Sequence, residues 1–213
     1  MKKSVLYFLF FIFITLPGKA GDNDYIINML NAKTMTDTAT VQSTLVTAAN
    51  YFERIALMNP EKWLPYYYAA YCYTRISHLN KGADKRDAWV DKAQIEIDKA
   101  FKNDPKNSEI LVMKGFVLQA RMDINPMVRG FEYNKETLAY FDKAIELNPD
   151  NPRSYLWKGV NLYHTPSFFG GGKDKAYILI NTAIEKFKAN PPKDMLAPDW
   201  GYKYALEMIE KCK

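Results

Sequence analysis

The stretch IELNPDNPRSYLWKG, residues 145 to 159, joins the end of one apolar helical run to the start of another. Its first proline, Pro149, ends the first run because proline has no amide donor and disfavours helical geometry in the residue before it. An aromatic residue, Tyr155, and a glycine, Gly159, follow six and ten residues after that proline. If this arrangement recurs at a fixed period, it is the unit of a repeat protein and not a single turn.

The arrangement does recur. Three prolines are separated by 45 and 44 residues: Pro60, Pro105 and Pro149. Ten residues after each proline comes a small residue: Ala70, Gly115 and Gly159. The runs before the prolines agree as well, with Phe52, Ile97 and Phe141 eight residues upstream. Small and large residues at fixed helical offsets let one helix approach another closely, so we predict a stack of helix pairs.

The pattern resembles the tetratricopeptide repeat (TPR), whose first helix carries W-x2-L-G-x2-Y and whose second carries A-x3-F-x2-A. The glycine position is Ala70, Gly115 and Gly159, and the first aromatic position is Tyr66, Leu111 and Tyr155. The second-helix triplets are Ala93/Ile97/Ala100, Thr137/Phe141/Ala144 and Ala176/Ile180/Ala183. The resemblance covers roughly residues 40 to 190. It implies an all-α fold, a right-handed superhelical stack of antiparallel helix pairs with about nine helices.

Two features depart from the family pattern. The period is about 44 residues where the family has 34, which requires longer helices or longer loops and also falls in the range of HEAT repeats, our alternative architecture. The apolar position before the glycine is Lys114 in one unit and Lys158 in the next. Either these side chains extend along a helix edge, or the register of the first helices is shifted by one residue.

The expected helices follow from the apolar periodicity and the glycine and proline clusters. They cover residues 24–34, 38–58, 62–79, 84–102, 107–122, 134–147, 151–164, 172–189 and 199–211. Loops are expected at 79–85, 122–134 and 164–174. We predict one domain over residues 21–213, with repeats at roughly 61–105, 106–149 and 150–191, an N-terminal cap at 21–60 and a C-terminal cap helix at 199–211.

The first twenty residues have the pattern of a secretory signal peptide. Lys2 and Lys3 precede an apolar run of 12 residues that ends at Leu16, and Ala20 follows as a small residue suited to cleavage. The run is shorter than the roughly 20 residues of a membrane-spanning helix, and no cysteine follows it for a lipid anchor. We predict cleavage after Ala20 and a periplasmic or secreted mature chain without a membrane span; the alternative is an uncleaved leader or another cleavage site.

The charge and the cysteine content of the chain further narrow the class of protein. Without the three lysines of the leader, 26 basic residues stand against 24 acidic ones, a net charge of +2. The two signs are interspersed, whereas a nucleic-acid-binding surface needs a basic stripe, so we expect no nucleic-acid partner. Cys72 and Cys212 are expected to be free, because repeats of a linear array contact only their neighbours.

No pattern for catalysis or metal binding stands out. The segment FFGGGKDKA, residues 168–176, lacks the P-loop spacing and the Ser or Thr after Lys173. His78 and His164 lack ligand spacing and are expected at the surface or at loop edges. We therefore predict a protein that is not an enzyme, with no catalytic residue, metal or cofactor. A hydrolase with paired carboxylates is kept as a third hypothesis.

Aromatic residues make up 15% of the chain. Tyr66, Tyr67 and Tyr68 are consecutive, so they fan around a helix and at least one of them should be exposed. In the TPR family the concave groove is lined by first-helix positions beside the packing ones. The resemblance implies that the groove residues here are Tyr67, Tyr71, Arg75, Val112, Phe116, Gln119, Arg153, Leu156, Val160 and Tyr163.

Such a groove is apolar and aromatic, and it suits an extended or helical peptide or an apolar ligand better than an acidic tail. We therefore expect an exported TPR-type binding or scaffold protein that holds a protein or peptide segment in its concave groove, in an envelope assembly. The alternative is a solute-binding accessory protein for the transport of an apolar small molecule.

Overall fold

The computed structural model describes residues 21–213, and in that part of the chain it contains nine α-helices, one short 3-10 helix and no strand. The helices are α1 (Asp22–Asp37), α2 (Gln42–Met58), α3 (Trp63–Leu79), α4 (Ala83–Asn103), α5 (Ser108–Met122), α6 (Pro126–Leu147), α7 (Pro152–His164), η1 (Ser167–Phe169), α8 (Lys173–Ala189) and α9 (Tyr202–Cys212). The predicted leader, residues 1–20, lies outside the described residues.

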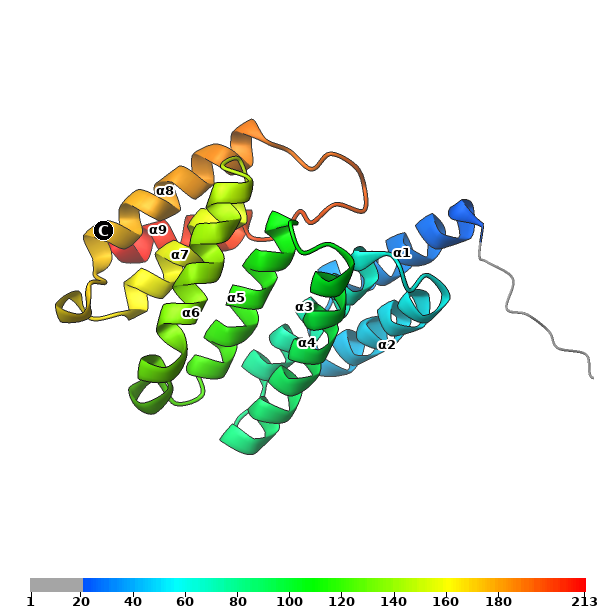
Figure 1. Ribbon diagram of the computed structural model, residues 1–213, viewed down its shortest axis with the longest axis horizontal. Helices are drawn as coiled ribbons and strands as arrows, with labels where there is room; N and C mark the ends of the chain where they lie inside the picture. The colour runs from blue at the N-terminus through cyan, green and yellow to red at the C-terminus, as the bar shows by residue number, and fades with distance from the viewer. Residues whose placement is uncertain (1–20) are drawn as a thin grey trace, which may run out of the picture.

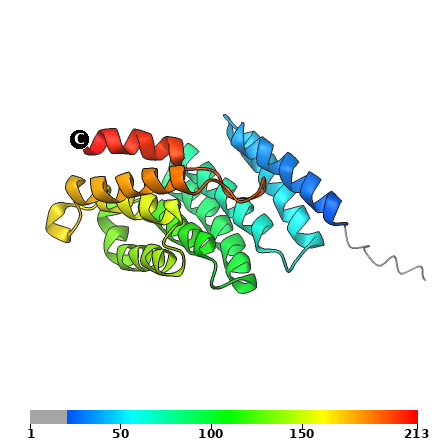
Figure 2. The ribbon, with the colours of Figure 1, turned by 90° about the horizontal axis from the view of Figure 1, so that it is seen from above.

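Successive helices run antiparallel and stack side by side along the molecule (Figure 1). The pairs are α1/α2, α3/α4, α5/α6 and α7/α8, and among the first helices α5 contacts both α3 and α7. In the perpendicular view α1 and α9 lie on the same side of this stack (Figure 2). The predicted all-α, TPR-like stack of helix pairs is confirmed.

The small residues of the repeat lie where the two helices of a pair cross. A Cβ atom on Gly115 would come within 2.4 Å of the Phe141 ring, and one on Gly159 would come within 2.7 Å of Cγ1 of Ile180. Phe141 and Ile180 are fully buried residues of the second helices α6 and α8. The absent side chain therefore lets the helices approach until the large residue of the partner fills the space.

The two lysines before these glycines pack along the helix edge, and the register is the predicted one. Lys114 of α5 pairs with Asp98 of α4, and Lys158 of α7 pairs with Asp142 of α6. The two ion pairs are related by the repeat period, and each links neighbouring units. An apolar position of the family is replaced here by a recurring bridge between units.

The prediction of a loop over residues 122–134 was wrong, because α6 begins at Pro126 and only residues 123–125 connect it to α5. The Asn-Pro pair that predicted a turn instead begins a helix, where proline is favoured because its missing amide is not needed. Gly130 lies within that helix beside open space. The longer period thus comes from second helices of 21 and 22 residues, α4 and α6, joined by short connections.

The C-terminal segment does more than the predicted cap at 199–211. Helix α9 packs on α8, but residues 190–201, which we call the strap, first cross the concave side toward α1 and α3 (Figure 2). The Lys33 ammonium lies 2.6 Å from the Asp199 carboxylate, and the Tyr68 hydroxyl donates to the Leu196 carbonyl at 2.8 Å. The strap is therefore anchored to helices near the opposite end of the chain.

Both cysteines are free, as predicted, and both are buried. Cys72 lies in the core of α3, where burial raises the pKa of its thiol to about 12. It acts as a small apolar residue and not as a nucleophile.

Candidate functional site

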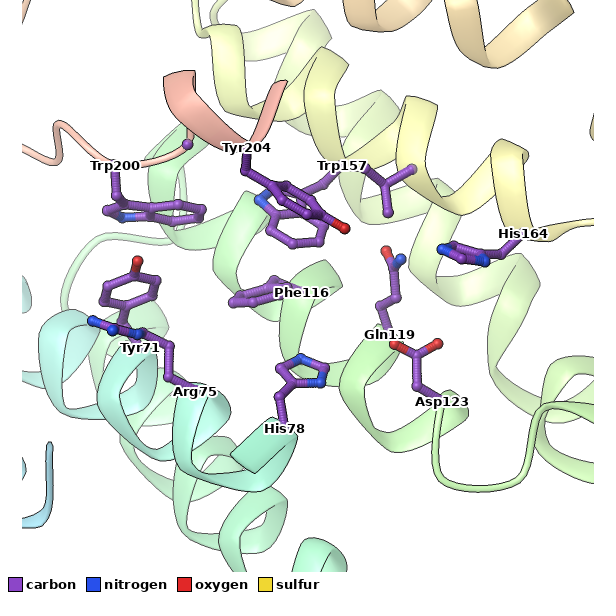
Figure 3. Close-up of a pocket in the computed structure, with 12 residues that line it drawn as sticks. Tyr71, Arg75, His78, Phe116, Gln119, Asp123, Trp157, His164, Trp200 and Tyr204 are labelled. Atoms are coloured by element: carbon purple, nitrogen blue, oxygen red, sulfur yellow. The ribbon is translucent and has the colours of Figure 1, made fainter. Parts of the chain in front are cut away.

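A cavity of about 350 Å³ opens on the concave face, within the range of roughly 300–1,000 Å³ found for small-molecule sites. Three first helices and the C-terminal segment build it (Figure 3). The lining residues are Tyr71, Arg75 and His78 of α3, Phe116 and Gln119 of α5, Asp123 just after α5, Trp157, Val160 and His164 of α7, and Trp200, Gly201 and Tyr204. The strap and the start of α9 thus supply one wall.

Aromatic rings form most of the cavity wall. The ring centroids of Phe116 and Trp157 are 4.0 Å apart, and Tyr204 stacks on Trp157 at 5.5 Å. On the side toward α3, Tyr71 stacks on Trp200 at 4.6 Å (Figure 3). These contacts hold the rings in fixed orientations, so the cavity is a preformed surface for a flat apolar group.

A buried hydrogen-bond network fixes Trp200. The Trp200 indole donates to the Tyr67 hydroxyl at 3.1 Å, and the Tyr67 hydroxyl donates to Glu109 at 3.2 Å. Arg153 binds Glu109 through both Nε and Nη2 and donates from Nη1 to the Trp200 carbonyl at 3.1 Å. Helices α3, α5 and α7 therefore meet at the strap through one ion pair.

Burial within this network affects two pKa values. Burial raises the pKa of Tyr67 well above its usual value, so its hydroxyl stays protonated. For Arg153 burial opposes the charge, but Glu109 outweighs it and raises the pKa of the guanidinium above its usual value. The Arg153 guanidinium thus stays charged and the Tyr67 hydroxyl remains a hydrogen-bond donor.

The end of the cavity toward α5 and α7 is polar. Gln119 is 2% exposed, and its Oε1 atom has no hydrogen-bond partner among residues 21–213. Asp123 and His164 lie beyond it, and His78 lies across the cavity under Phe116 (Figure 3). An unpartnered acceptor in the wall of a cavity is suited to a donor on a ligand or to water.

The protonation states at this polar end are shifted from their ordinary values. His78 lies at the exposed mouth of the cavity, and desolvation beside the Phe116 ring lowers its pKa to about 4, with a contribution from the charge of Arg86. Burial raises the pKa of Asp123, while His164 and Arg86 act in the opposite direction. The His78 imidazole is therefore neutral at neutral pH and carries a free nitrogen lone pair.

Arg75 supplies a positive charge on the α3 side. It donates to the carbonyls of Thr36 at 2.7 Å and Ala39 at 3.2 Å, and it lies 5.6 Å from the centroid of the Tyr71 ring. In residues 21–213 it forms no salt bridge with a carboxylate. Its charge is thus available to an anionic group at the cavity rim.

The structure brings half of the sequence-predicted groove residues together in this cavity: Tyr71, Arg75, Phe116, Gln119 and Val160. It places Tyr67, Val112 and Leu156 in the interior, fully buried, and Arg153 in its ion pair beneath the strap. Tyr163 flanks the cavity, where Lys173 covers its ring. The groove expected from the resemblance is open, whereas here the strap covers part of it.

The strap also explains the burial of the consecutive tyrosines at residues 66–68. Tyr66 is the partly exposed member, while Tyr67 and Tyr68 are both buried. One of these two rings would face solvent on an isolated helix pair, and the strap shields it.

Sequence reasoning missed seven lining residues: His78, Asp123, Trp157, His164, Trp200, Gly201 and Tyr204. The two histidines are exposed and lie at helix ends, as predicted, and the structure in addition places both at one cavity. Each lies in the last turn of a first helix, a shared position that could have linked them. Trp200 and Tyr204 lie outside the repeats, so no periodic signal pointed to them.

The described residues contain neither a candidate metal site nor a candidate membrane span. No group of three or more His, Cys, Asp and Glu residues between 21 and 213 is arranged to hold a metal ion. None of the helices in that range is both long and apolar enough to cross a membrane.

Comparisons with known proteins show the family of the chain. No protein-family model matches the chain, and no curated protein matches it. A solved structure titled as a TPR protein, YrrB, with an unusual peptide-binding site, is 17% identical with a TM-score of 0.35 over 89% of this chain and 93% of that one. The solved HusA haemophore from Porphyromonas gingivalis is 30% identical with a TM-score of 0.80, over 89% of this chain and 92% of that chain. The chain described here therefore belongs to the family of the HusA haemophore.

Proposed function

We propose that this protein is an exported, non-enzymatic binding protein that holds haem, or a closely related porphyrin, in the cavity on its concave face. The observation that carries the proposal is the preformed aromatic wall made by Phe116, Trp157, Trp200 and Tyr204. Membership in a family that includes a haemophore supports it.

The chemistry of the cavity matches the parts of such a ligand. A porphyrin is a flat apolar ring system, and aromatic side chains bind flat rings by offset stacking while removing apolar surface from water. Its carboxylates need cationic partners, and Arg75 lies at the rim with no carboxylate of its own. The neutral imidazole of His78 and the amide of Gln119 offer polar contacts to the ring centre or to bound water.

The strap favours a small molecule over a peptide in this site. A peptide in the concave groove would have to lie where residues 190–201 already contact Tyr68 and Lys33. What remains open is a short cavity and not a continuous channel. We therefore favour the solute-binding function, which is the alternative predicted from the sequence, over the peptide-binding function.

The test is a titration of haem, and of metal-free porphyrin, into the protein, followed by visible absorption and by quenching of tryptophan fluorescence. Two of the four tryptophans, Trp157 and Trp200, line the cavity, so binding should quench strongly. Replacing Trp157 by Ala should weaken binding by about thirtyfold, the effect of losing a central aromatic contact. Trp89→Ala is the matched control, because Trp89 stacks on Tyr73 away from the cavity.

The proposal fails if the wild-type protein does not bind either ligand, or if W157A binds as tightly as the wild type. If a protein is captured instead, and its capture is lost in Y71A, the peptide-binding hypothesis replaces it.

Export is proposed from the leader pattern of residues 1–20. Intact-mass measurement of the protein recovered from outside the cytoplasm of its own host should give a chain that begins at Gly21. A mass that retains the leader would contradict cleavage there.

A further inference from the structure

Outside the cavity, the most unusual surface is a group of exposed apolar side chains at the connections between paired helices. We call it the phenylalanine patch, and its members are Met127, Val128, Phe131, Phe168 and Phe169. The side chains of Phe131, Phe168 and Phe169 are 79%, 90% and 58% exposed. Contiguous exposed aromatic residues are rare on soluble proteins unless they contact another apolar surface.

The patch is one surface, although its residues come from two connections. The ring centroids of Phe131 and Phe169 are 5.7 Å apart, and those of Phe168 and Phe169 are 5.3 Å apart. Met127 and Val128 lie one turn before Phe131 on α6, and thus on the same side of that helix. The connection that carries η1 projects beyond the helices in both views (Figures 1 and 2). The apolar side chains therefore stand on a convex tip and not in a groove.

Lysines without salt-bridge partners follow the patch residues along the chain in both connections; Lys173 among them donates to the Lys211 carbonyl at 2.9 Å. Residues 126–135 and 166–175 contain four basic and two acidic side chains, and Arg129 is already paired with Asp87. The remaining cations are Lys135, Lys173 and Lys175, and none of them forms a salt bridge within residues 21–213. Lys175 donates to the Gly170 carbonyl at 2.8 Å, which holds its charge beside the phenylalanines.

We propose that the phenylalanine patch docks the protein onto an anionic lipid surface, with the aromatic tip inserted at the interface and the three lysines on the lipid headgroups. A convex apolar tip with flanking lysines combines the two contributions that bind a protein to a bilayer surface: burial of apolar area and attraction to anionic lipid. A second copy of the chain would bring the same three positive charges opposite these, which disfavours self-association through the patch.

Docking in this orientation would bring the cavity close to the lipid. His164 lines the cavity, and the residues that follow it lead directly into Phe168. On the other side, Asp123 lines the cavity and the next connection leads into Met127. The lipid contact does not depend on which ligand the cavity takes.

The test is co-sedimentation of residues 21–213 with vesicles of phosphatidylcholine alone and with added phosphatidylglycerol. This part of the chain contains all nine α-helices and the packed core, and omitting the leader removes an apolar run that would itself bind lipid. Wild type should bind the anionic vesicles, bind less at high salt, and bind the neutral vesicles weakly. The triple variant F131S/F168S/F169S should lose about tenfold or more of the binding.

The matched control is L57S/M58S, two exposed apolar residues at the end of α2, which should bind as wild type does. The variant K135Q/K173Q/K175Q should reduce binding to anionic vesicles but not to neutral ones. Circular dichroism checks that each variant is folded, and the haem titration shows whether the cavity is intact.

The proposal is overturned if wild type does not sediment with anionic vesicles, or if the phenylalanine variant sediments as wild type does. It is also overturned if the patch instead causes dimerisation or protein capture that the phenylalanine variant abolishes, with no lipid binding. Haem binding that persists in the phenylalanine variant would leave the proposed function untouched by any of these results.

Discussion

The crossings within the helix pairs and the cavity on the concave face are both built on the first helices. They differ in whether the residues that form them recur at the repeat period. Each crossing repeats one motif, a glycine against a large apolar residue, as in Gly115 with Phe141 and Gly159 with Ile180. The cavity repeats nothing, because each first helix contributes different side chains and the strap closes one side. Residues that recur at the period therefore hold the stack together, and the residues that break the pattern form the site.

The largest effect on stability should come from deleting the C-terminal segment, the wall of the cavity that lies outside the repeats. Deleting residues 198–213 removes Trp200 and the buried face of α9, with Met208 and Ile209, and exposes the apolar side of α8. We expect insoluble or aggregated protein, since loss of one such buried side chain alone costs about 2–5 kcal/mol. Solubility and thermal melting measure it, with deletion of Lys213 alone as the control. A soluble truncation that melts cooperatively would show that the stack is complete without this wall.

The next largest effect on the free energy of unfolding should come from breaking the ion pair between Glu109 and Arg153 beneath the strap. Glu109→Ala leaves Arg153 buried without its partner, which we expect to cost about 3–5 kcal/mol of unfolding free energy. Glu146→Ala is the matched control, because its pair with Lys143 is exposed and should contribute less than about 1 kcal/mol. Urea denaturation measures both. Equal losses in the two variants would mean that the network does not tie the strap to the helices.

A side chain added at the glycine of a helix crossing should lower the stability of the protein. Gly115→Val forces atoms against the Phe141 ring and should cost about 1–3 kcal/mol, while its control, Gly130→Ala, enters open space on α6 and should gain up to about 1 kcal/mol. Denaturant midpoints compare the two variants. If Gly115→Val were as stable as Gly130→Ala, close approach would not explain the glycine of the repeat.

The smallest effect concerns acid stability at the cavity. The pKa of His78 is lowered to about 4 in the folded protein from 6.5 in the unfolded chain, so the unfolded chain binds the proton more readily. The stabilisation is present above pH 6.5 and is lost as the pH falls toward 4. We expect the melting temperature of His78→Gln to fall less than that of wild type between pH 7 and 4.5. Parallel curves would show that His78 does not titrate abnormally.

The sequence predicted the stack better than the helix boundaries. The prolines and small residues identified eight of the nine described helices to within a few residues. Helix α6 begins eight residues before its expected start, because the Asn125-Pro126 pair is typical of a turn but here begins the helix. Five of the twelve residues that line the candidate site, all on α3, α5 and α7, could be predicted from the repeat. Trp200 and Tyr204 could not, since neither belongs to a unit.

By itself, the sequence determined the helix pairs, their register and their crossings, because each of these depends on contacts between residues close in the chain that recur at a regular spacing. The path of the strap was decided only in the tertiary structure. Its anchors join Lys33 to Asp199 and Tyr68 to Leu196, which are 166 and 128 residues apart. No local pattern encodes such contacts, because they form only after the stack has placed α1 and α3 opposite the last helix pair. That placement turns an open groove into a partly covered aromatic cavity.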